Sequence, residues 1–282
     1  MAHLLIMEGN TIARQNEAAA LGVRSASGVY REAVLADFPD LHVDVVHAAD
    51  PGQTPPDGRA LADYDALIVG GSGLHAYDTD FAVTNQIAML RAFAETGKPI
   101  LGSCWGLQIA AIAGGGEVRL SPNGREVIVA RKIRKLGAGL AHPFLAGRGD
   151  TFDAPCIHYD EVTALPPGSQ VLCGNAHSAI QGAIVPLGKS EVWAVQYHPE
   201  FDLDHLRMLV RLYAAAMLEQ GFFADEDERA HYEARLALLH ADPGNRAAAW
   251  QLGIDADLLD ARRRRSEIIA WIERCVLPAA RA

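Results

Sequence analysis

Several features are scarce in this chain of 282 residues, and each absence excludes a class of protein. No apolar run approaches the roughly 18 residues that a membrane crossing needs, so we expect no membrane protein. The formal net charge is −10, and the chain therefore lacks the basic surface that nucleic-acid binding requires. The opening residues, MAHLLIMEGN, do not resemble a secretory signal, and we expect a cytoplasmic protein.

Cysteine is scarce as well, with four residues in the chain and no CxxC pair among them. This spacing argues against a zinc or redox motif, and a chain of this length needs no disulfides to hold its core. We therefore expect reduced thiols, with Cys156, Cys173 and Cys275 packed among apolar side chains. Cys104 is left free to react.

The chain does contain short apolar runs that alternate with helical patterns. The sequence predicts strands at 3–8, 41–48, 64–71 and 98–104, and helices at 27–38 and 79–97. Strands that alternate with helices form parallel pairs through right-handed crossovers. The predicted fold class is therefore α/β, a mostly parallel open sheet with helices on both faces.

The middle of the chain changes character. Residues 116–133 contain Asn-Gly between two strand-like runs, which predicts a hairpin. Residues 190–201 form a predicted strand that leads into a helical pattern over 202–221. We therefore predict one α/β domain over residues 1–220, with an antiparallel patch, and a small C-terminal helical extension over 221–282.

The predicted extension contains two amphipathic helical patterns, 225–240 and 255–276. We expect its Trp250 and Trp271 to anchor it against the main domain or against a second copy, which would make a homo-oligomer. The run Arg262–Arg265 is interpreted as a solvated helix face, because acidic residues lie close to it. The alternative is a site for an anion or an acidic partner.

One candidate for chemistry is Cys104, within PILGSCWGLQIAAIAGG. This stretch predicts a strand, a sharp turn and a helix, which would expose the thiol at the carboxyl end of the sheet. The helix N-terminus would stabilise a thiolate and offer N–H groups to an oxyanion. Gly102 and Gly106 allow the tight turn. From these residues alone, a packed structural cysteine stays an alternative.

A second candidate is the pair His198 and Glu200, within VQYHPEF. Side chains two residues apart on an extended segment point the same way, so Glu200 can accept a hydrogen bond from the imidazole. The other ring nitrogen would then face Cys104, which gives a Cys–His–Glu triad. Taken singly, a histidine such as His198 is more often a hydrogen-bonded surface or core residue without a catalytic role.

A third candidate is the glycine-rich stretch IVGGSG at residues 68–73. It could aim a backbone N–H at a developing oxyanion, or it could be an ordinary turn after a strand. It matches neither GxGxxG nor a P-loop, so it does not indicate a nucleotide site.

Together the three motifs resemble the class I glutamine amidotransferase domain, particularly its GMP synthetase-like branch. The resemblance covers roughly residues 40–205 and implies a flavodoxin-like sheet. It also implies that Cys104 attacks the side-chain amide of glutamine and that His198 activates the thiol and protonates the departing ammonia. Glu200 would orient the imidazole ring. This cycle needs neither a metal nor an organic cofactor.

The resemblance further implies which groups bind the substrate. The backbone N–H groups of Gly71 and Trp105 would hold the oxyanion, although the bulk of Trp105 could narrow the pocket. The amino-acid end of glutamine would contact Gln108 and the backbone near His158, Tyr159 and Asp160.

Three functions are compatible with this sequence. The first is hydrolysis of glutamine to glutamate and ammonia, for a separate synthetase or another acceptor protein. The second is hydrolysis of γ-glutamyl amides or peptides with the same triad, which needs no partner. The third is a regulatory module without catalysis, which the filled triad positions disfavour.

Overall fold

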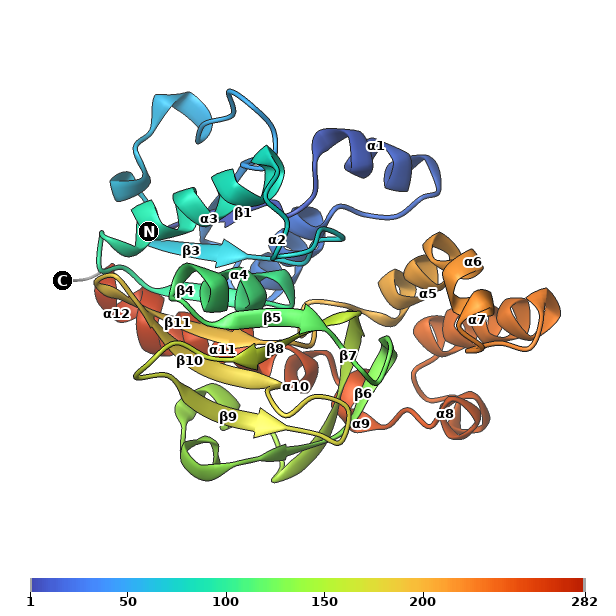
Figure 1. Cartoon of the computed structure of the whole chain (residues 1–282). Helices are drawn as coiled ribbons and strands as arrows, with labels where there is room; N and C mark the ends of the chain where they lie inside the picture. The colour runs from blue at the N-terminus through green and yellow to red at the C-terminus, as the bar shows by residue number, and fades with distance from the viewer. Residues whose placement is uncertain (1, 281–282) are drawn as a thin grey trace.

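The alternating strands of the first half build the parallel half of a large sheet (Figure 1). A computed structural model describes residues 2–280 of the chain. The parallel strands, in spatial order, are β2 (His42–Val46), β1 (His3–Met7), β3 (Ala66–Val69), β4 (Ile100–Ser103) and β11 (Ser190–Val195). All residues of β3 and β4 are buried, because helices cover both faces of the sheet here.

The other half of the same nine-stranded sheet is antiparallel. It continues from β11 through β10 (Gly182–Leu187), β9 (Gln170–Gly174), β6 (Glu126–Lys135) and β7 (Thr151–His158). The predicted α/β fold, a parallel sheet joined to an antiparallel part, is confirmed.

The hairpin predicted around the Asn-Gly pair is wrong. The strand before it, β5 (Glu117–Leu120), pairs with β8 (Asp160–Ala164) in a separate two-stranded sheet, whereas β6 pairs with β7 and β9. A turn does exist, and Gly124 has a positive φ of 77°. It redirects the chain because Val118 of β5 packs with Val162 of β8 in the core, while β6 finds a longer partner in β7.

Helices cover the two faces of the sheet with separate apolar clusters. The first four are α1 (Ile12–Ala20), α2 (Ala26–Asp37), α3 (Phe81–Ala94) and α4 (Trp105–Ala113). On one face, Tyr30 of α2 packs with Ile6 of β1. On the other face, Phe93 of α3 and Leu107 of α4 pack with Leu67 of β3. Short 3₁₀ helices occur at Pro56–Gly58, Leu61–Asp63, Gly137–Leu140 and Pro143–Leu145.

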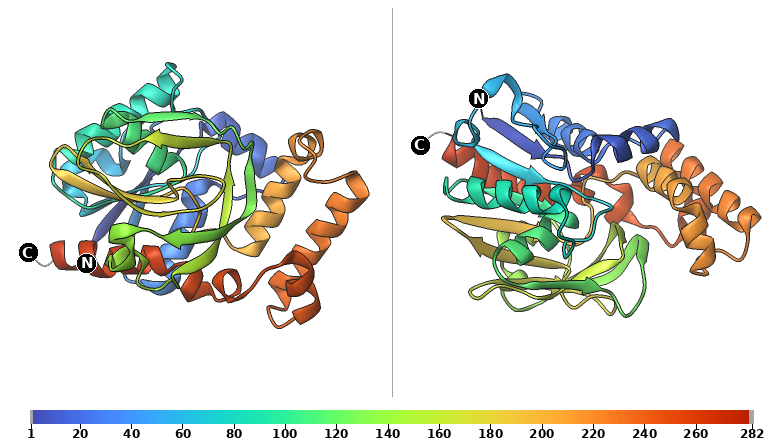
Figure 2. Two further views of the ribbon diagram at one scale, coloured as in Figure 1. Left: turned by 60° about the horizontal axis from the view of Figure 1, so that its bottom comes forward. Right: turned by 45° about the horizontal axis from the view of Figure 1, so that its top comes forward.

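After β11 the chain is helical, and its first part forms a lobe at the side of the sheet (Figure 2). The lobe contains α5 (Leu203–Leu212), α6 (Ala214–Glu219), α7 (Glu226–Ala241) and α8 (Arg246–Leu252). Leu206 and Leu209 of α5 pack with Leu236 of α7 in a third apolar cluster. The helix predicted over 202–221 therefore consists of two helices, α5 and α6.

The last helices return to the face of the sheet that α2 covers. They are α9 (Ala256–Leu259), α10 (Ala261–Arg264), α11 (Ser266–Trp271), a π-helical turn (Ile272–Val276) and α12 (Leu277–Ala279). The single helix predicted over 255–276 is wrong, because Asp260 ends one helix and caps the next through the Arg263 N–H. The boundary at residue 220 stays a prediction. None of the helices in residues 2–280 combines the length and hydropathy of a membrane span.

Candidate active site

Cys104 lies at the N-cap of α4, directly after β4, with φ of +50° and ψ of −97°. A side chain other than glycine rarely adopts this backbone, and such strain is concentrated at functional sites. The Cys104 N–H donates to the Val195 carbonyl at 2.8 Å. A Cβ on Gly102 would lie 2.8 Å from the Gly106 backbone, and one on Gly106 would lie 2.5 Å from the Val69 carbonyl oxygen. The elbow therefore depends on both glycines.

His198 and Glu200 follow β11 and lie against this elbow. The Nδ1 atom of His198 is 2.7 Å from Oε1 of Glu200, and both side chains are almost fully buried. Ser103 donates a second hydrogen bond to the same Glu200 oxygen at 3.1 Å. The Phe201 ring stacks on the His198 ring at 3.8 Å between centroids, which fixes the orientation of the imidazole.

The surroundings of His198 favour its protonated form. Burial alone would lower the pKa of His198, but the charge of Glu200 and the interactions with Cys104 and Glu200 outweigh burial and raise this pKa to about 10. An imidazolium beside a thiol can donate a proton to a departing amine. The structure thus brings the three predicted triad residues together, and their roles stay predictions.

The two residues predicted for the oxyanion hole flank the triad. A Cβ on Gly71 would lie 2.7 Å from Cε1 of His198, so the glycine loop contacts the edge of the imidazole ring between its two nitrogens. Trp105 begins α4, and its fully buried indole donates to Oε1 of Gln86 at 2.8 Å. The indole packs between α3 and α4 rather than in the cleft, so the expectation that it narrows the pocket is wrong.

A cleft of about 470 Å³ opens above Cys104, and the four predicted substrate contacts line it. Gln108 donates to the carbonyl oxygen of Asp160 at 3.1 Å, and Nδ1 of His158 approaches the same oxygen at 3.0 Å. The Cys104 thiol points to the Ile157 carbonyl at 3.7 Å. The segment from Ile157 to Asp160 is therefore held against both the nucleophile and α4.

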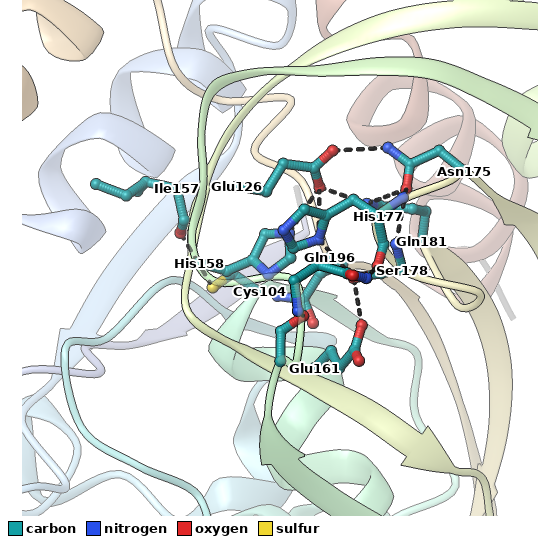
Figure 3. Close-up of polar contacts among 12 residues, drawn as sticks. Cys104, Glu126, Ile157, His158, Glu161, Asn175, His177, Ser178, Gln181 and Gln196 are labelled. Atoms are coloured by element: carbon teal, nitrogen blue, oxygen red, sulfur yellow. Dashed lines mark hydrogen bonds and ion pairs between the residues drawn. The ribbon is translucent and has the colours of Figure 1, made fainter. Parts of the chain in front are cut away.

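A buried carboxylate, that of Glu126, binds the His158 side chain of the 157–160 segment (Figure 3). It accepts hydrogen bonds from Nε2 of His158 at 2.8 Å, Gln181 at 2.6 Å and Asn175 at 2.7 Å. Burial alone would raise the pKa of Glu126, but His158 and Asn175 lower it overall. Both ring nitrogens of His158 lie within hydrogen-bond distance of an oxygen atom, so the ring is held at two points.

The same cluster is the candidate metal centre of the described residues. Glu126, His158 and His177 offer ligand atoms that all lie within 4.8 Å of one another. However, protein donors already occupy both oxygens of the carboxylate, so the geometry favours a role in positioning His158. The sequence did not indicate Glu126, because its partners lie 32 to 55 residues away and no local motif marks it.

Two residues that follow the glycine loop, His75 and Tyr77, contact Asp160 of the same segment. Nδ1 of His75 lies 2.6 Å from Oδ2 of Asp160, and the hydroxyl of Tyr77 donates to Oδ1 at 3.3 Å. Burial and the neighbouring Asp160 raise the pKa of Tyr77 to about 12. No sequence motif indicated either contact.

The outer walls of the cleft come from α1, α5 and the start of α6. Apolar and aromatic side chains on the lobe side are Phe201, Leu209, Leu212 and Tyr213. Three arginines also line the cleft: Arg14 of α1, Arg24 before α2, and Arg125 before β6. The space thus extends from the nucleophile toward the helical lobe, which the sequence motifs did not indicate.

A thiol on an elbow after a parallel strand, beside a histidine–carboxylate pair, is the arrangement of α/β enzymes that form covalent acyl intermediates. Residues 31–210 match the family model described as Glutamine amidotransferase class-I. The chain therefore belongs to this family, as its motifs suggested. The family and its relatives support an amide-hydrolysing enzyme.

Two curated relatives illustrate the range of the family. The chain is 29% identical, over 99% of its own length and 94% of the relative's, to a gamma-glutamyl-L-1-hydroxyisopropylamide hydrolase of a Pseudomonas species. It is 25% identical to a glutamine-hydrolysing GMP synthase subunit of Methanoculleus marisnigri, over 61% of this chain and 84% of that protein.

Solved structures share the fold along nearly the whole chain. A glutamine amidotransferase of Thermotoga maritima superimposes with a TM-score of 0.66 at 16% identity, covering 95% of this chain and 98% of that one. A glutamine amidotransferase of Methylobacillus flagellatus gives a TM-score of 0.63 at 20% identity, covering 97% and 95%. The α/β fold is thus one that other members of this class share.

Proposed function

We propose that this protein hydrolyses γ-glutamyl amides through a thioester on Cys104. The observation that carries the proposal is the strained Cys104 beside the His198–Glu200 pair, at the base of a cleft that continues toward the helical lobe. The similarity to the Pseudomonas hydrolase along 99% of the chain, lobe included, supports the same conclusion.

Acylation begins when the Cys104 sulfur, whose proton passes to His198, attacks the γ-carbonyl carbon of the substrate. The backbone N–H groups of Gly71 and Trp105 hold the resulting oxyanion. When the C–N bond breaks, His198 passes a proton to the leaving nitrogen, and a free amine and a thioester result. Glu200 keeps Nδ1 of His198 protonated and aimed, so Nε2 is the atom that transfers protons.

Deacylation uses the same groups with water in place of the amine. His198 takes a proton from a water molecule, and the hydroxide attacks the thioester carbon. The C–S bond breaks, glutamate leaves and the proton returns to sulfur. No step of this cycle requires a metal or a redox cofactor, and Gln108 and the 158–160 segment hold the glutamyl group throughout.

The leaving amine of the proposed substrate is larger than ammonia. The cleft walls beyond His198 include Phe201, Leu209 and Leu212, which offer apolar surface that glutamine would leave uncovered. Apolar walls with a few polar groups are typical of pockets that bury an organic ligand. A small amine with some carbon surface would fill this space.

The second candidate is hydrolysis of glutamine itself, with ammonia passed to a separate synthetase. The observation that favours it is the similarity to the GMP synthase subunit of Methanoculleus marisnigri, of which the matched region covers 84%. An acceptor protein would then be this chain's partner, and activity on glutamine would depend on it.

The test is to measure glutamate release from a panel of γ-glutamyl amides and from glutamine. We expect the alkyl amides to be preferred over glutamine in kcat/KM, and Cys104→Ala to lose roughly 10³-fold or more. Cys275→Ala, which changes a half-buried cysteine of the C-terminal π-helical turn, is the matched control and should stay active.

Other outcomes separate the remaining functions. A preference for glutamine would favour the amidotransferase candidate. Full activity of Cys104→Ala would contradict the thioester mechanism. If no substrate is hydrolysed and a glutamine-analogue affinity label fails to attach to Cys104, the chain is a module without catalysis.

A further inference from the structure

Arg125 is one of two cleft arginines, with Arg14, that have no carboxylate partner in the described chain, and it is the one that stacks on Tyr159 of the 157–160 segment. Within residues 2–280, no carboxylate lies within 4.0 Å of its guanidinium, and its Nε makes a long hydrogen bond to Gln220 at 3.4 Å. Arginines elsewhere, such as Arg148 and Arg265, are paired with carboxylates at 2.7 to 2.8 Å. A half-buried cation left unpaired inside a cleft is suited to bind an anionic ligand.

Two aromatic rings hold the Arg125 guanidinium in place. Its central carbon lies 4.7 Å from the centroid of the Tyr159 ring and 5.4 Å from that of the Tyr213 ring. Cation–π contacts of this kind orient the planar group while its terminal N–H groups stay available. Little side-chain freedom is then lost when a carboxylate binds.

The position of Arg125 relates it to one part of the substrate. The ring that it covers, Tyr159, is two residues beyond Ile157, whose carbonyl contacts the Cys104 thiol. The acyl carbon must lie at Cys104, and the leaving nitrogen must lie at His198. The remaining end of a γ-glutamyl group carries its α-carboxylate, and on the proposed function this end lies along the 157–160 segment, which lines the cleft.

We propose that Arg125 binds the α-carboxylate of the γ-glutamyl group and thereby selects γ-glutamyl amides over amides without that carboxylate. This inference rests on the proposed function, and it names the residue that recognises the acyl half of the substrate. The matched comparison is Arg14, the other cleft arginine without a carboxylate partner in the described chain. Arg14 donates to the Tyr213 hydroxyl at 3.3 Å and packs against Gly73 of the glycine loop.

The test compares two chromogenic substrates that differ only in the α-carboxylate: L-γ-glutamyl-p-nitroanilide and 4-aminobutyryl-p-nitroanilide. For Arg125→Gln we expect kcat/KM on the glutamyl substrate to fall roughly 10- to 100-fold, mainly through KM, with no change on the 4-aminobutyryl substrate. Arg14→Gln should keep the preference of the unchanged protein for the glutamyl substrate.

Two results would overturn the assignment. An equal loss on both substrates in Arg125→Gln would show a structural role, and a collapse of the preference in Arg14→Gln would move the carboxylate site to Arg14. If the unchanged protein cleaves neither anilide, calorimetry with the product, L-glutamate, decides separately from catalysis. We expect glutamate to bind, and roughly 10- to 100-fold more weakly to Arg125→Gln; no binding, or equal binding, would contradict the proposal.

Discussion

At the scale of single residues, the site depends on the backbone of Cys104. Its φ of +50° would cost free energy in an unconstrained chain, and it persists because β4 and α4 are packed too closely for any other path. Gly102 and Gly106 provide this closeness, since each lies where a Cβ would meet backbone atoms. The sequence predicted this elbow from the small residues around a single cysteine.

The pH dependence of stability is a prediction at the same scale. The pKa of His198 is raised in the folded protein to about 10, above its ordinary 6.5. The folded state therefore binds a proton more tightly than the unfolded state, and this contribution is complete below pH 6.5 and is lost as the pH rises toward 10. In Glu200→Gln we expect a loss of unfolding free energy that is larger at about pH 6 than at about pH 9.5.

Urea unfolding of the unchanged protein and of Glu200→Gln at the two pH values measures this difference in unfolding free energy. Glu219→Gln, which changes an exposed acid of α6, is the control and should show no such trend. A loss of the same size at both pH values for Glu200→Gln would contradict the assigned cause of the His198 shift.

At the scale of elements, the last helices are attached to the sheet by buried polar contacts. The arginine run 262–265 was expected to be a solvated face, and this expectation is wrong for two of its members. Arg264 is 7% exposed, and Arg265 pairs with Asp37 at the end of α2 at 2.7 Å. Consecutive residues of a helix point about 100° apart, so the four arginines of α10 and its C-cap cannot share one exposed face.

A buried ion pair links α11 to the antiparallel half. Arg148 donates to Glu267 at 2.8 and 3.0 Å, and neither side chain is exposed to solvent. The hydroxyl of Tyr197, the residue before His198, donates to the same carboxylate at 2.7 Å. Thus α11 supports the strand end that carries the proposed catalytic histidine.

Glu267→Gln should destabilise the protein by about 3–5 kcal/mol, because Arg148 would be left as a buried charge without a counter-ion. Thermal and urea unfolding measure the loss. Glu273→Gln, a change of an exposed acid on the following turn, is expected to have an effect within about 0.5 kcal/mol. Equal stability of the two variants would show that the Arg148–Glu267 ion pair adds nothing to the free energy of unfolding.

At the scale of the whole molecule, the chain end completes the core beneath the sheet. Ile268, Trp271, Ile272 and Val276 are buried with Tyr30 of α2. The expectation that Trp271 anchors the extension on the main domain is therefore correct. Trp250 is 83% exposed, so it does not anchor the lobe within the chain. Its contact with a second copy stays a prediction.

The two tryptophans should accordingly differ in their effect on stability. Trp271→Ala removes a fully buried indole and should cost about 3–5 kcal/mol of unfolding free energy. Trp250→Ala should change it by less than about 0.5 kcal/mol at protein concentrations where the chain is monomeric. Urea unfolding checks both values. Sedimentation of Trp250→Ala beside the unchanged protein tests whether Trp250 contacts a second copy of the chain.

The α/β fold and the placement of the candidate triad could be predicted from the sequence alone. Both depend on short-range patterns: apolar strands that alternate with helices, the glycines around Cys104, and the two-residue spacing of His198 and Glu200. Such patterns depend only on the local backbone geometry of a helix, strand or turn, so they can be recognised from the spacing of residues along the chain.

The surroundings of the triad, in contrast, depend on tertiary packing and could not be predicted. The Glu126–His158 contact joins residues 32 positions apart, and Tyr213 reaches Arg14 across 199 positions. The failed hairpin belongs to the same group, since the partners of β6 follow from burial and strand length rather than from the turn before it. Contacts between distant residues depend on how the elements pack, so charges without partners, such as that of Arg125, are visible only once the chain is folded.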